Sequence, residues 1–400
     1  MTNLKREPIG VWINRYRPPR LRSIEREYHA SWIELFFDLV FVFVIAELSH
    51  HLKAHLSVVG FLEFAALFVP CWWAWVLFTF YADRFETDDV IHRLLVLTGM
   101  LTIIFLGINV HNAFEEGSAN FAIAYVTIRS IVLALYARAA RHVPVARASL
   151  KLYLASYVPS TCLWLISIVV PEPFRYVLWV IAMIIELSVP IIGSRMLAGT
   201  PSHPSHLPER FGLFTMIVLG EAIVSVSSGT ADTNWQLPSI IAAVGGFAIA
   251  ACLWWLYYNF LDSSVVIRGI RSVHIYNYGH LPILMGLTLV AVGTEHAIVE
   301  ATEHALSAGT RWALCGGVAL YMLTIAFIWV GACRRRVTWI AVAAISIALG
   351  LAIAGGALPP LVTLGLLLAM LVGKVSLEIF KARGKTQTVE EKPSHIDAQH

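Results

Sequence analysis

Several ionisable side chains lie inside long apolar stretches of this sequence, where a charged group needs a partner. On insertion scales a charge near the centre of a bilayer costs about 2.5 to 3.5 kcal/mol, so such residues face a bundle interior and often bind ions or relay protons. The candidates for transport or gating are Asp38, Glu47, Glu221, Arg129, Glu186 and Lys374. The alternative is that these residues form ion pairs that only hold helices together.

Glu47 and Glu221 are the pair that most favours a shared role. One constant shift superimposes Phe37, Leu39, Val44 and Glu47 on Phe211, Leu213, Val218 and Glu221. The two glutamates are therefore expected at matching depths on the first helix of each half. If both face one cavity, burial disfavours their charged form, and they can bind and release protons. The alternative is that each is neutral, or is paired with Arg129 or Lys374, and simply holds helices together.

Three potential metal ligands share one side of the first apolar helix. Glu47, His50 and His51 are spaced i, i+3 and i+4, which brings them together near one helix end. Imidazole and carboxylate groups bind metals such as Zn²⁺, and histidine also titrates near neutral pH. The pattern predicts a metal site or a proton entry point, and the alternative is that these histidines are simply solvated.

Charged residues also crowd the connection between the second and third apolar segments. Asp83, Arg84, Asp88 and Asp89 lie there, and His280 lies in the corresponding region of the second half. Such a mouth would attract or gate cations electrostatically; the alternative is a set of ion pairs that pin helix ends. No recognisable catalytic motif occurs, so we expect no catalytic residues and no cofactor.

Membrane-spanning helices must position these residues. Of the 400 residues, 58% are hydrophobic and 14% are charged, which does not suit a water-facing surface. Apolar stretches of roughly 20 residues, long enough to cross a hydrocarbon core, recur from about residue 31 to 381. We therefore predict an all-α polytopic membrane protein with about 12 transmembrane helices. Its partner is the lipid bilayer; the composition favours no nucleic acid and indicates no particular oligomeric state.

The helices divide into two sets of six, which predicts an internal duplication with parallel halves. The predicted organisation is a basic cytoplasmic N-terminal segment (1–30), a first six-helix repeat (31–194), a cytoplasmic linker (195–207), a second six-helix repeat (208–381) and a disordered cytoplasmic tail (382–400). Lysine and arginine set the orientation because cationic loops are poorly translocated. Most of them fall inside only when both termini are cytoplasmic.

Four motifs follow one another between about residues 30 and 290. They are Glu34-Leu-Phe-Phe-Asp38, Arg84-Phe-Glu-Thr-Asp88-Asp89, Arg210-Phe-Gly-Leu-Phe leading to Gly220-Glu221, and Tyr278-Gly-His280-Leu-Pro282. With these motifs the chain resembles the bacterial low temperature requirement protein A family, which usually has Asp where this chain has Glu86. The resemblance implies a multi-pass protein of the bacterial inner membrane. It implies no established reaction or substrate.

The leading hypothesis is a transporter or channel for a small ion, a proton or another small solute, with intramembrane carboxylates as coupling or gating groups. Two alternatives come from other classes. One is a membrane enzyme acting on lipid or lipid precursors, which would suit a role in growth in the cold. The other is a sensor or scaffold whose buried charges are purely structural.

Overall fold

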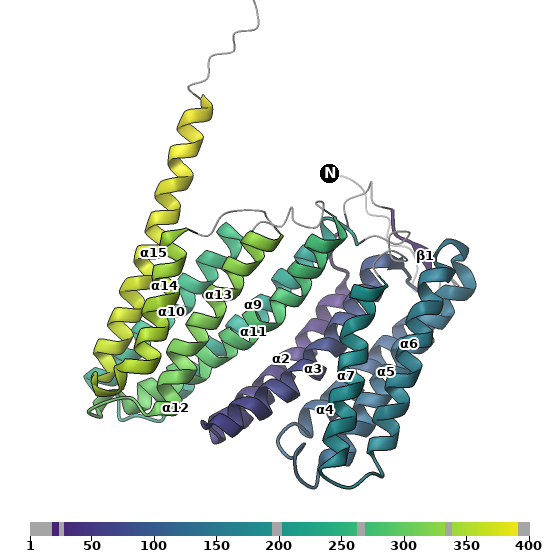
Figure 1. Ribbon diagram of the computed structural model, residues 1–400, viewed down its shortest axis with the longest axis horizontal. Helices are drawn as coiled ribbons and strands as arrows, with labels where there is room; N and C mark the ends of the chain where they lie inside the picture. Colours follow the sequence, from purple (N-terminus) through teal and green to yellow (C-terminus); the bar gives the residue numbers. More distant parts are fainter. Residues whose placement is uncertain (1–17, 24–27, 194–201, 262–268, 333–337, 391–400) are drawn as a thin grey trace, which may run out of the picture. The chain divides into compact units, whose positions relative to one another are not determined.

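The computed structural model describes residues 18–23, 28–193, 202–261, 269–332 and 338–390, and these are almost entirely helical (Figure 1). The first helices are α2 (Trp32–Ala54), α3 (Val58–Arg84), α4 (Val90–Ile108), α5 (Ser118–His142), α6 (Arg147–Ser167) and α7 (Phe174–Ile192). The later helices are α9 (His206–Ala231), α10 (Leu237–Phe260), α11 (Ile270–Val299), α12 (Ala308–Arg311), α13 (Gly317–Gly331), α14 (Trp339–Ala354) and α15 (Pro360–Glu390). A π-helical segment, Trp312–Gly316, joins α12 to α13, and a small sheet pairs β1 (Arg20–Leu21) with β2 (Phe85–Glu86). The predicted all-α fold class is confirmed.

Ten of the described helices are long and apolar enough to cross a membrane. Nine of them are α3, α4, α5, α7, α9, α10, α11, α14 and α15. The tenth, Ala308–Gly331, comprises α12, the π-helical segment and α13. Helices α2 and α6 are also long, at 23 and 21 residues, but they are not among these ten. At about 1.5 Å per residue, both would reach across a core about 30 Å thick. A multi-pass membrane protein is thus confirmed, and the count of twelve spans stays a prediction.

Two acidic residues fix where helices begin. Glu34 accepts hydrogen bonds from the backbone N–H and the hydroxyl of Ser31, at 3.3 and 2.7 Å, which stabilises the first turn of α2. Asp89 precedes α4 and accepts a hydrogen bond of 2.9 Å from the backbone N–H of His92. A carboxylate at a helix N-terminus satisfies unpaired donors there, so both acids are held in place.

The helices form two compact units. Unit 1 comprises residues 1–221, 263–288 and 331–333, and unit 2 comprises residues 222–262, 289–330 and 334–400. In unit 1, α4 to α7 pack in sequence order, and α2 packs on α3 and α4. Helix α3 forms the core of this unit, because every side chain from Pro70 to Tyr81 is buried. In unit 2, α15 packs on α10 and α14.

The predicted halves and the compact units divide the chain differently. The first part of α9, up to Glu221, and the first part of α11, up to Thr288, belong to unit 1. The predicted second repeat instead begins at residue 208, so the duplication stays a prediction. In the predicted linker, residues 195–201 lie outside the described residues, and α9 begins near the linker's end, at His206.

The end of the chain differs from the sequence prediction. Helix α15 continues to Glu390, so residues 382–390 are helical where the sequence predicts a disordered tail. This segment is rich in good helix formers, and no proline follows Pro360 until Pro393. The predictions for residues 1–17, 24–27 and 391–400 lie outside the described part of the chain.

Candidate functional site

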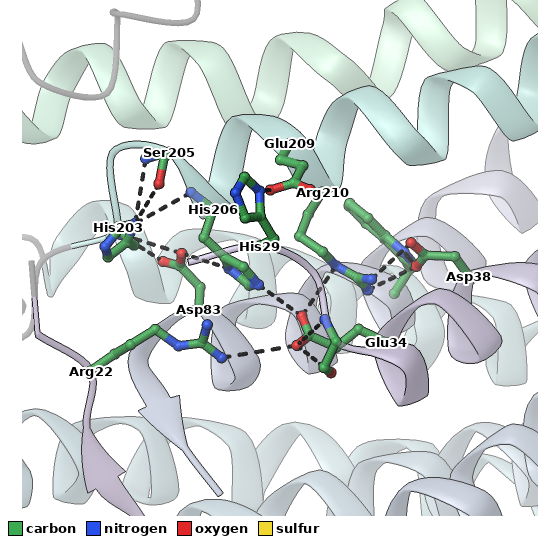
Figure 2. A network of polar contacts seen from close by, with 12 residues as sticks. Arg22, His29, Glu34, Asp38, Asp83, His203, Ser205, His206, Glu209 and Arg210 are labelled. Atoms are coloured by element: carbon green, nitrogen blue, oxygen red, sulfur yellow. Dashed lines mark hydrogen bonds and ion pairs between the residues drawn. The ribbon is translucent and has the colours of Figure 1, made fainter. Parts of the chain in front are cut away.

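Two helices of unit 1 meet along a line of acids and bases. On α2, Glu34 and Asp38 are four residues apart and share one helix face. His206 and Arg210 have the same spacing on α9. His206 Nε2 lies 2.9 Å from Glu34 Oε2. Arg210 donates two hydrogen bonds of 2.8 Å to Asp38 (Figure 2). The pairs follow the same order along both helices, so α2 and α9 run parallel here.

A third helix completes the surroundings of the His206 ring. The Oδ1 atom of Asp83, near the end of α3, lies 3.3 Å from His206 Nδ1. The same carboxylate accepts hydrogen bonds of 3.1 and 3.3 Å from the backbone N–H of His203. The imidazole therefore lies between the carboxylates of Glu34 and Asp83 (Figure 2). A neutral ring can donate to only one of them, whereas a protonated ring donates to both.

The two acids of α2 share neighbours. Trp75 Nε1 donates a hydrogen bond of 2.8 Å to Asp38. Arg210 Nε lies 3.6 Å from Glu34 Oε2, so the guanidinium contacts both acids. Arg22 approaches from the N-terminal segment and places its Nη2 atom 3.9 Å from Glu34. These contacts join three helices and the N-terminal segment into one polar network.

The network is buried. The exposed fractions are 0% for His206, 1% for Arg210 and Asp83, 2% for Asp38 and 8% for Glu34. The contacts described above involve three carboxylates, those of Glu34, Asp38 and Asp83. They involve two guanidinium groups, those of Arg210 and Arg22. With a neutral His206 the contacts leave one negative charge in excess, and a proton on His206 balances it. An unbalanced charge in a protein interior costs several kcal/mol. The charges of the neighbouring side chains therefore favour the protonated form of His206.

A small cavity lies beside this network in unit 1. Its lining comprises Ile33, Glu34, Phe37, Phe78, Tyr81, Ala82, His92, Val96 and Arg210. Most of these side chains are apolar, and Glu34, Arg210 and His92 supply the polar groups. The cavity is roomy enough for water, which needs polar partners of this kind to stay in a buried space. Glu34 and Arg210 of the network therefore border this space directly.

Two of the predicted mouth residues form ion pairs beside the beginning of α4. Asp89 receives a hydrogen bond of 3.0 Å from Arg138 Nη1 and a second, shorter one from Nη2. Asp88 accepts a hydrogen bond of 2.8 Å from Arg93 Nε. The first pair joins α4 to α5, whereas the second is local. These contacts match the alternative in which charges pin helix ends.

The remaining predicted mouth residues lie in different surroundings. Arg84 is buried and donates a hydrogen bond of 3.1 Å to the carbonyl oxygen of Phe80. His280 is fully buried, with Nδ1 2.6 Å from the carbonyl oxygen of Tyr276. Of the predicted mouth residues, Asp83 is the one that contacts His206 directly.

Arg129 and Glu186 form a second buried ion pair in unit 1. Arg129 Nε lies 3.2 Å from Glu186 Oε1, and both side chains are 0% exposed. Glu186 also accepts hydrogen bonds from the hydroxyls of Tyr125, at 2.9 Å, and Ser160. The guanidinium lies 4.4 Å from the ring centroid of Tyr157. Contacts from three helices thus converge on this pair, which ties α5, α6 and α7 together.

Glu221 has a partner that the sequence does not predict. Its Oε1 atom lies 3.5 Å from Lys53 Nζ in the last turn of α2. The alternative pairing with Arg129 is not observed, because Arg129 pairs with Glu186, and Lys374 pairs with Glu378 on its own helix. Glu47 is half-buried, and no ion pair joins it to another described residue. The structure therefore does not bring Glu47 and Glu221 into contact.

The predicted metal ligands do not form a ready-made site. His51 is buried, whereas His50 is exposed and Glu47 is half-buried. Successive helical residues point about 100° apart, so His50 turns outward while His51 turns toward the bundle. There His51 faces Glu63, with Nε2 3.4 Å from Oε2. In the part of the chain that is described, no three His, Cys, Asp or Glu side chains are already placed to hold a metal ion.

Lys374 is buried in unit 2. Its Nζ atom lies 2.6 Å from Glu378 Oε1, one turn further along α15, and 5.0 Å from the ring centroid of Trp329. Lys374 also lines a small, mainly apolar cavity with Leu256, Met322, Ile325, Ala326, Trp329 and Ala341. The predicted burial of this lysine is observed, and its partner is a neighbour on its own helix.

A search for charged residues within apolar stretches does not single out Glu34, His206 and Arg210. These residues lie near the beginnings of α2 and α9, where a charge is unremarkable in a sequence. The signal that can find them is spacing: two acids at i and i+4 on one helix, and two bases at i and i+4 on another. The pairing itself links residues 172 positions apart, which no local pattern shows.

Fold and network together define a class, a multi-pass helical membrane protein with a buried ion network in one of its compact units. The chain belongs to the family of bacterial low temperature requirement A proteins (LtrA), whose sequence model matches residues 29–375. It is 30% identical over 294 residues to an uncharacterized protein, RA0937, of Rhizobium meliloti (strain 1021), and the alignment covers 68% of this chain and 70% of the relative. No solved structure matches the chain significantly. The resemblance predicted from the four motifs is confirmed.

Proposed function

We propose that this protein moves protons across the membrane, alone or coupled to another small ion or solute, and that His206 is the proton-binding residue. The observation that carries the proposal is the position of its ring, 2.9 Å from Glu34 and 3.3 Å from Asp83 and fully buried. Histidine is the side chain whose ordinary charge change falls between about pH 5 and 8. A buried histidine between two acids is therefore suited to loading and releasing a proton.

Loss of the proton changes the contacts on both sides of the ring. A protonated His206 donates to Glu34 and to Asp83, whereas the neutral ring leaves one of these carboxylates without its donor. The uncompensated charge then favours entry of a new proton, a cation or water from the adjoining cavity. Transport requires two such states of different contact pattern, between which ion binding shifts the population.

Other residues of the α2–α9 interface are placed to respond to this change. Arg210 contacts both Asp38 and Glu34, so a free Glu34 competes with Asp38 for the guanidinium. At the far end of α2, Lys53 contacts Glu221 near the middle of α9. We include Asp38 and Glu221 in the proposed proton path, with Asp38 near its beginning and Glu221 near its end.

The proposal is tested by proton flux in liposomes that contain the purified protein and an entrapped pH-sensitive dye. An imposed pH gradient, with the membrane potential clamped, should collapse faster with the protein than without it. His206→Gln should slow this flux at least tenfold, because glutamine keeps hydrogen-bonding capacity but does not take up a proton. A matched control is His304→Gln, since His304 is an exposed histidine of unit 2.

Thermal unfolding in detergent checks that both variants are folded before flux is compared. A folded His206→Gln variant with the flux of the unaltered protein would show that His206 is not the proton-binding residue. An unaltered protein that neither conducts protons nor takes up any small solute under a pH gradient would overturn the transport proposal as a whole.

A further inference from the structure

His51 is a buried histidine whose ring is poorly satisfied. Its side chain is 4% exposed, and neither ring nitrogen makes a hydrogen bond with a described residue. A neutral imidazole carries one donor and one acceptor, and a protonated one carries two donors, so every form needs partners. A buried polar group that the protein does not satisfy is suited to binding water or an ion.

The groups around His51 are all potential metal ligands. Glu63 on α3 places Oε2 3.4 Å from His51 Nε2, but the geometry does not make a hydrogen bond. The ring of His55, just after the end of α2, has its centroid 5.3 Å from that of His51. The ring of His111, after the end of α4, has its centroid 6.1 Å away. Three imidazoles and one carboxylate therefore gather at this end of unit 1.

These separations fit a tetrahedral metal better than direct contact. Two ligand atoms bound to Zn²⁺ at roughly 2.0 to 2.1 Å lie about 3.4 Å apart along the tetrahedron edge. This equals the distance between His51 Nε2 and Glu63 Oε2. Imidazoles that share such an ion have ring centroids about 5 Å apart. The His51–His55 spacing is close to that value, and His111 is somewhat further away.

We propose that His51 and Glu63 form the fixed half of a binding site for a transition-metal ion of the Zn²⁺ class, completed by His55 and His111. The proposal does not depend on the proton-transport proposal, which concerns other residues. No three ligands among the described residues converge before the metal arrives, so binding has to draw in two more side chains. His55 and His111 are exposed and lie outside the helix interiors. His55 Nδ1 lies 3.2 Å from the carbonyl oxygen of His51, which leaves its Nε2 atom as the ligand and matches the second hydrogen bond that metal-binding histidines usually make.

Charge and ligand type also favour this class of ion. Lys53, the nearby cation of α2, is held by Glu221 at 3.5 Å, which leaves Glu63 as the carboxylate in contact with His51. Nitrogen donors with one carboxylate suit Zn²⁺ and its neighbours, whereas Ca²⁺ and Mg²⁺ prefer oxygen ligands. The site should therefore select Zn²⁺ or Co²⁺ over Mg²⁺.

The test uses the full chain, purified in detergent with a tag that contains no histidine and freed of metal by a chelator. Titration with Co²⁺ reports geometry directly, because a tetrahedral site gives intense visible absorption that octahedral Co²⁺ lacks. We expect one Co²⁺ per chain, displaced by Zn²⁺ and not by Mg²⁺. His51→Gln and Glu63→Gln should each weaken binding at least tenfold, and His50→Gln should leave it unchanged because that side chain points outward.

His55→Gln and His111→Gln distinguish a four-ligand site from one formed by His51 and Glu63 alone. In a four-ligand site, each of these variants should reduce the tetrahedral Co²⁺ absorption. Thermal unfolding with and without Zn²⁺ is the second measurement, and the metal should stabilise the unaltered protein but not His51→Gln. Absence of stoichiometric Co²⁺ and Zn²⁺ binding to the folded protein would overturn the proposal. Binding that survives His51→Gln, or that His50→Gln removes instead, would overturn it equally.

Discussion

Arg210 is the cation on which both acids of α2 depend. It donates two hydrogen bonds to Asp38 and lies 3.6 Å from Glu34, while being 1% exposed. Truncating it leaves Asp38 with Trp75 as its partner among these contacts. We therefore expect Arg210→Met to destabilise the protein by about 3–5 kcal/mol, the cost of breaking a buried ion pair from one side. Unfolding in a denaturing detergent, followed by tryptophan fluorescence, measures this loss.

A double variant separates lost attraction from uncompensated charge. In Arg210→Met with Asp38→Leu, both charges of the pair are removed, so the loss should be smaller than for Arg210→Met alone. A double variant that is as unstable as the sum of the two single variants would show that no coupling exists between these residues.

The sequence predicts which charges are buried better than it predicts their partners. Asp38, Arg129, Glu186, Glu221 and Lys374 are all buried, as expected for ionisable groups within apolar helices. Hydropathy reports depth along a helix, but the partner depends on how helices are rotated and which ones are neighbours. For that reason the sequence does not indicate that Glu221 pairs with Lys53, and it assigns no role to His206.

At the scale of elements, Gly293 allows close packing within unit 2. A methyl group at this position of α11 would lie 2.3 Å from the backbone nitrogen of Leu314, in the π-helical segment before α13. Backbone atoms cannot move aside as a flexible side chain does. Small residues that allow backbones to approach are typical of helix contacts in membranes.

We expect Gly293→Ala to destabilise the protein by about 1–3 kcal/mol, the usual cost of overpacking. The midpoint of thermal unfolding in detergent should fall accordingly. Gly365→Ala on α15 is the matched control, because a methyl group there meets nothing within 4 Å. Equal midpoints for the two variants would show that α11 and the π-helical segment are not in close contact.

Apolar runs and helix breakers predict the apolar helices well. They do not predict a helix in a polar stretch of the sequence. The predicted first helix, beginning at residue 31, corresponds to α2, which begins at Trp32. Helix α2 carries the acids Glu34, Asp38 and Glu47, and it is not among the ten candidate spans. The helical extension of α15 is missed because its polar sequence carries no apolar period.

At the scale of the whole molecule, the orientation of α2 and α6 distinguishes twelve spans from ten. If both cross the membrane and the N-terminus is cytoplasmic, Ser57 lies outside and Val145 lies inside. If neither crosses, the two positions exchange sides. Arg138, Arg141 and Arg147 lie close to Val145, and such a cluster favours the inside.

Cysteine labelling in whole cells tests this prediction. In a background without the five native cysteines, a membrane-impermeant maleimide should label Ser57→Cys in intact cells. It should label Val145→Cys only after the cells are opened. The reverse pattern would contradict twelve spans with a cytoplasmic N-terminus. Both residues are exposed in the structure, so failure to react is not caused by burial.

The equal spacing on α2 and α9 has a consequence for how these helices can slide. Glu34 and Asp38 repeat every four residues, and so do His206 and Arg210. Displacing one helix along the other by one turn, about 6 Å, would place an acid opposite a base again. Arg210 already reaches toward Glu34, its acid in the displaced alignment. That register would keep one acid–base pair, Arg210 with Glu34, and would separate Asp38 and His206 from their present partners. A one-turn ratchet of these helices would therefore require Asp38 and His206 to be uncharged in the displaced state.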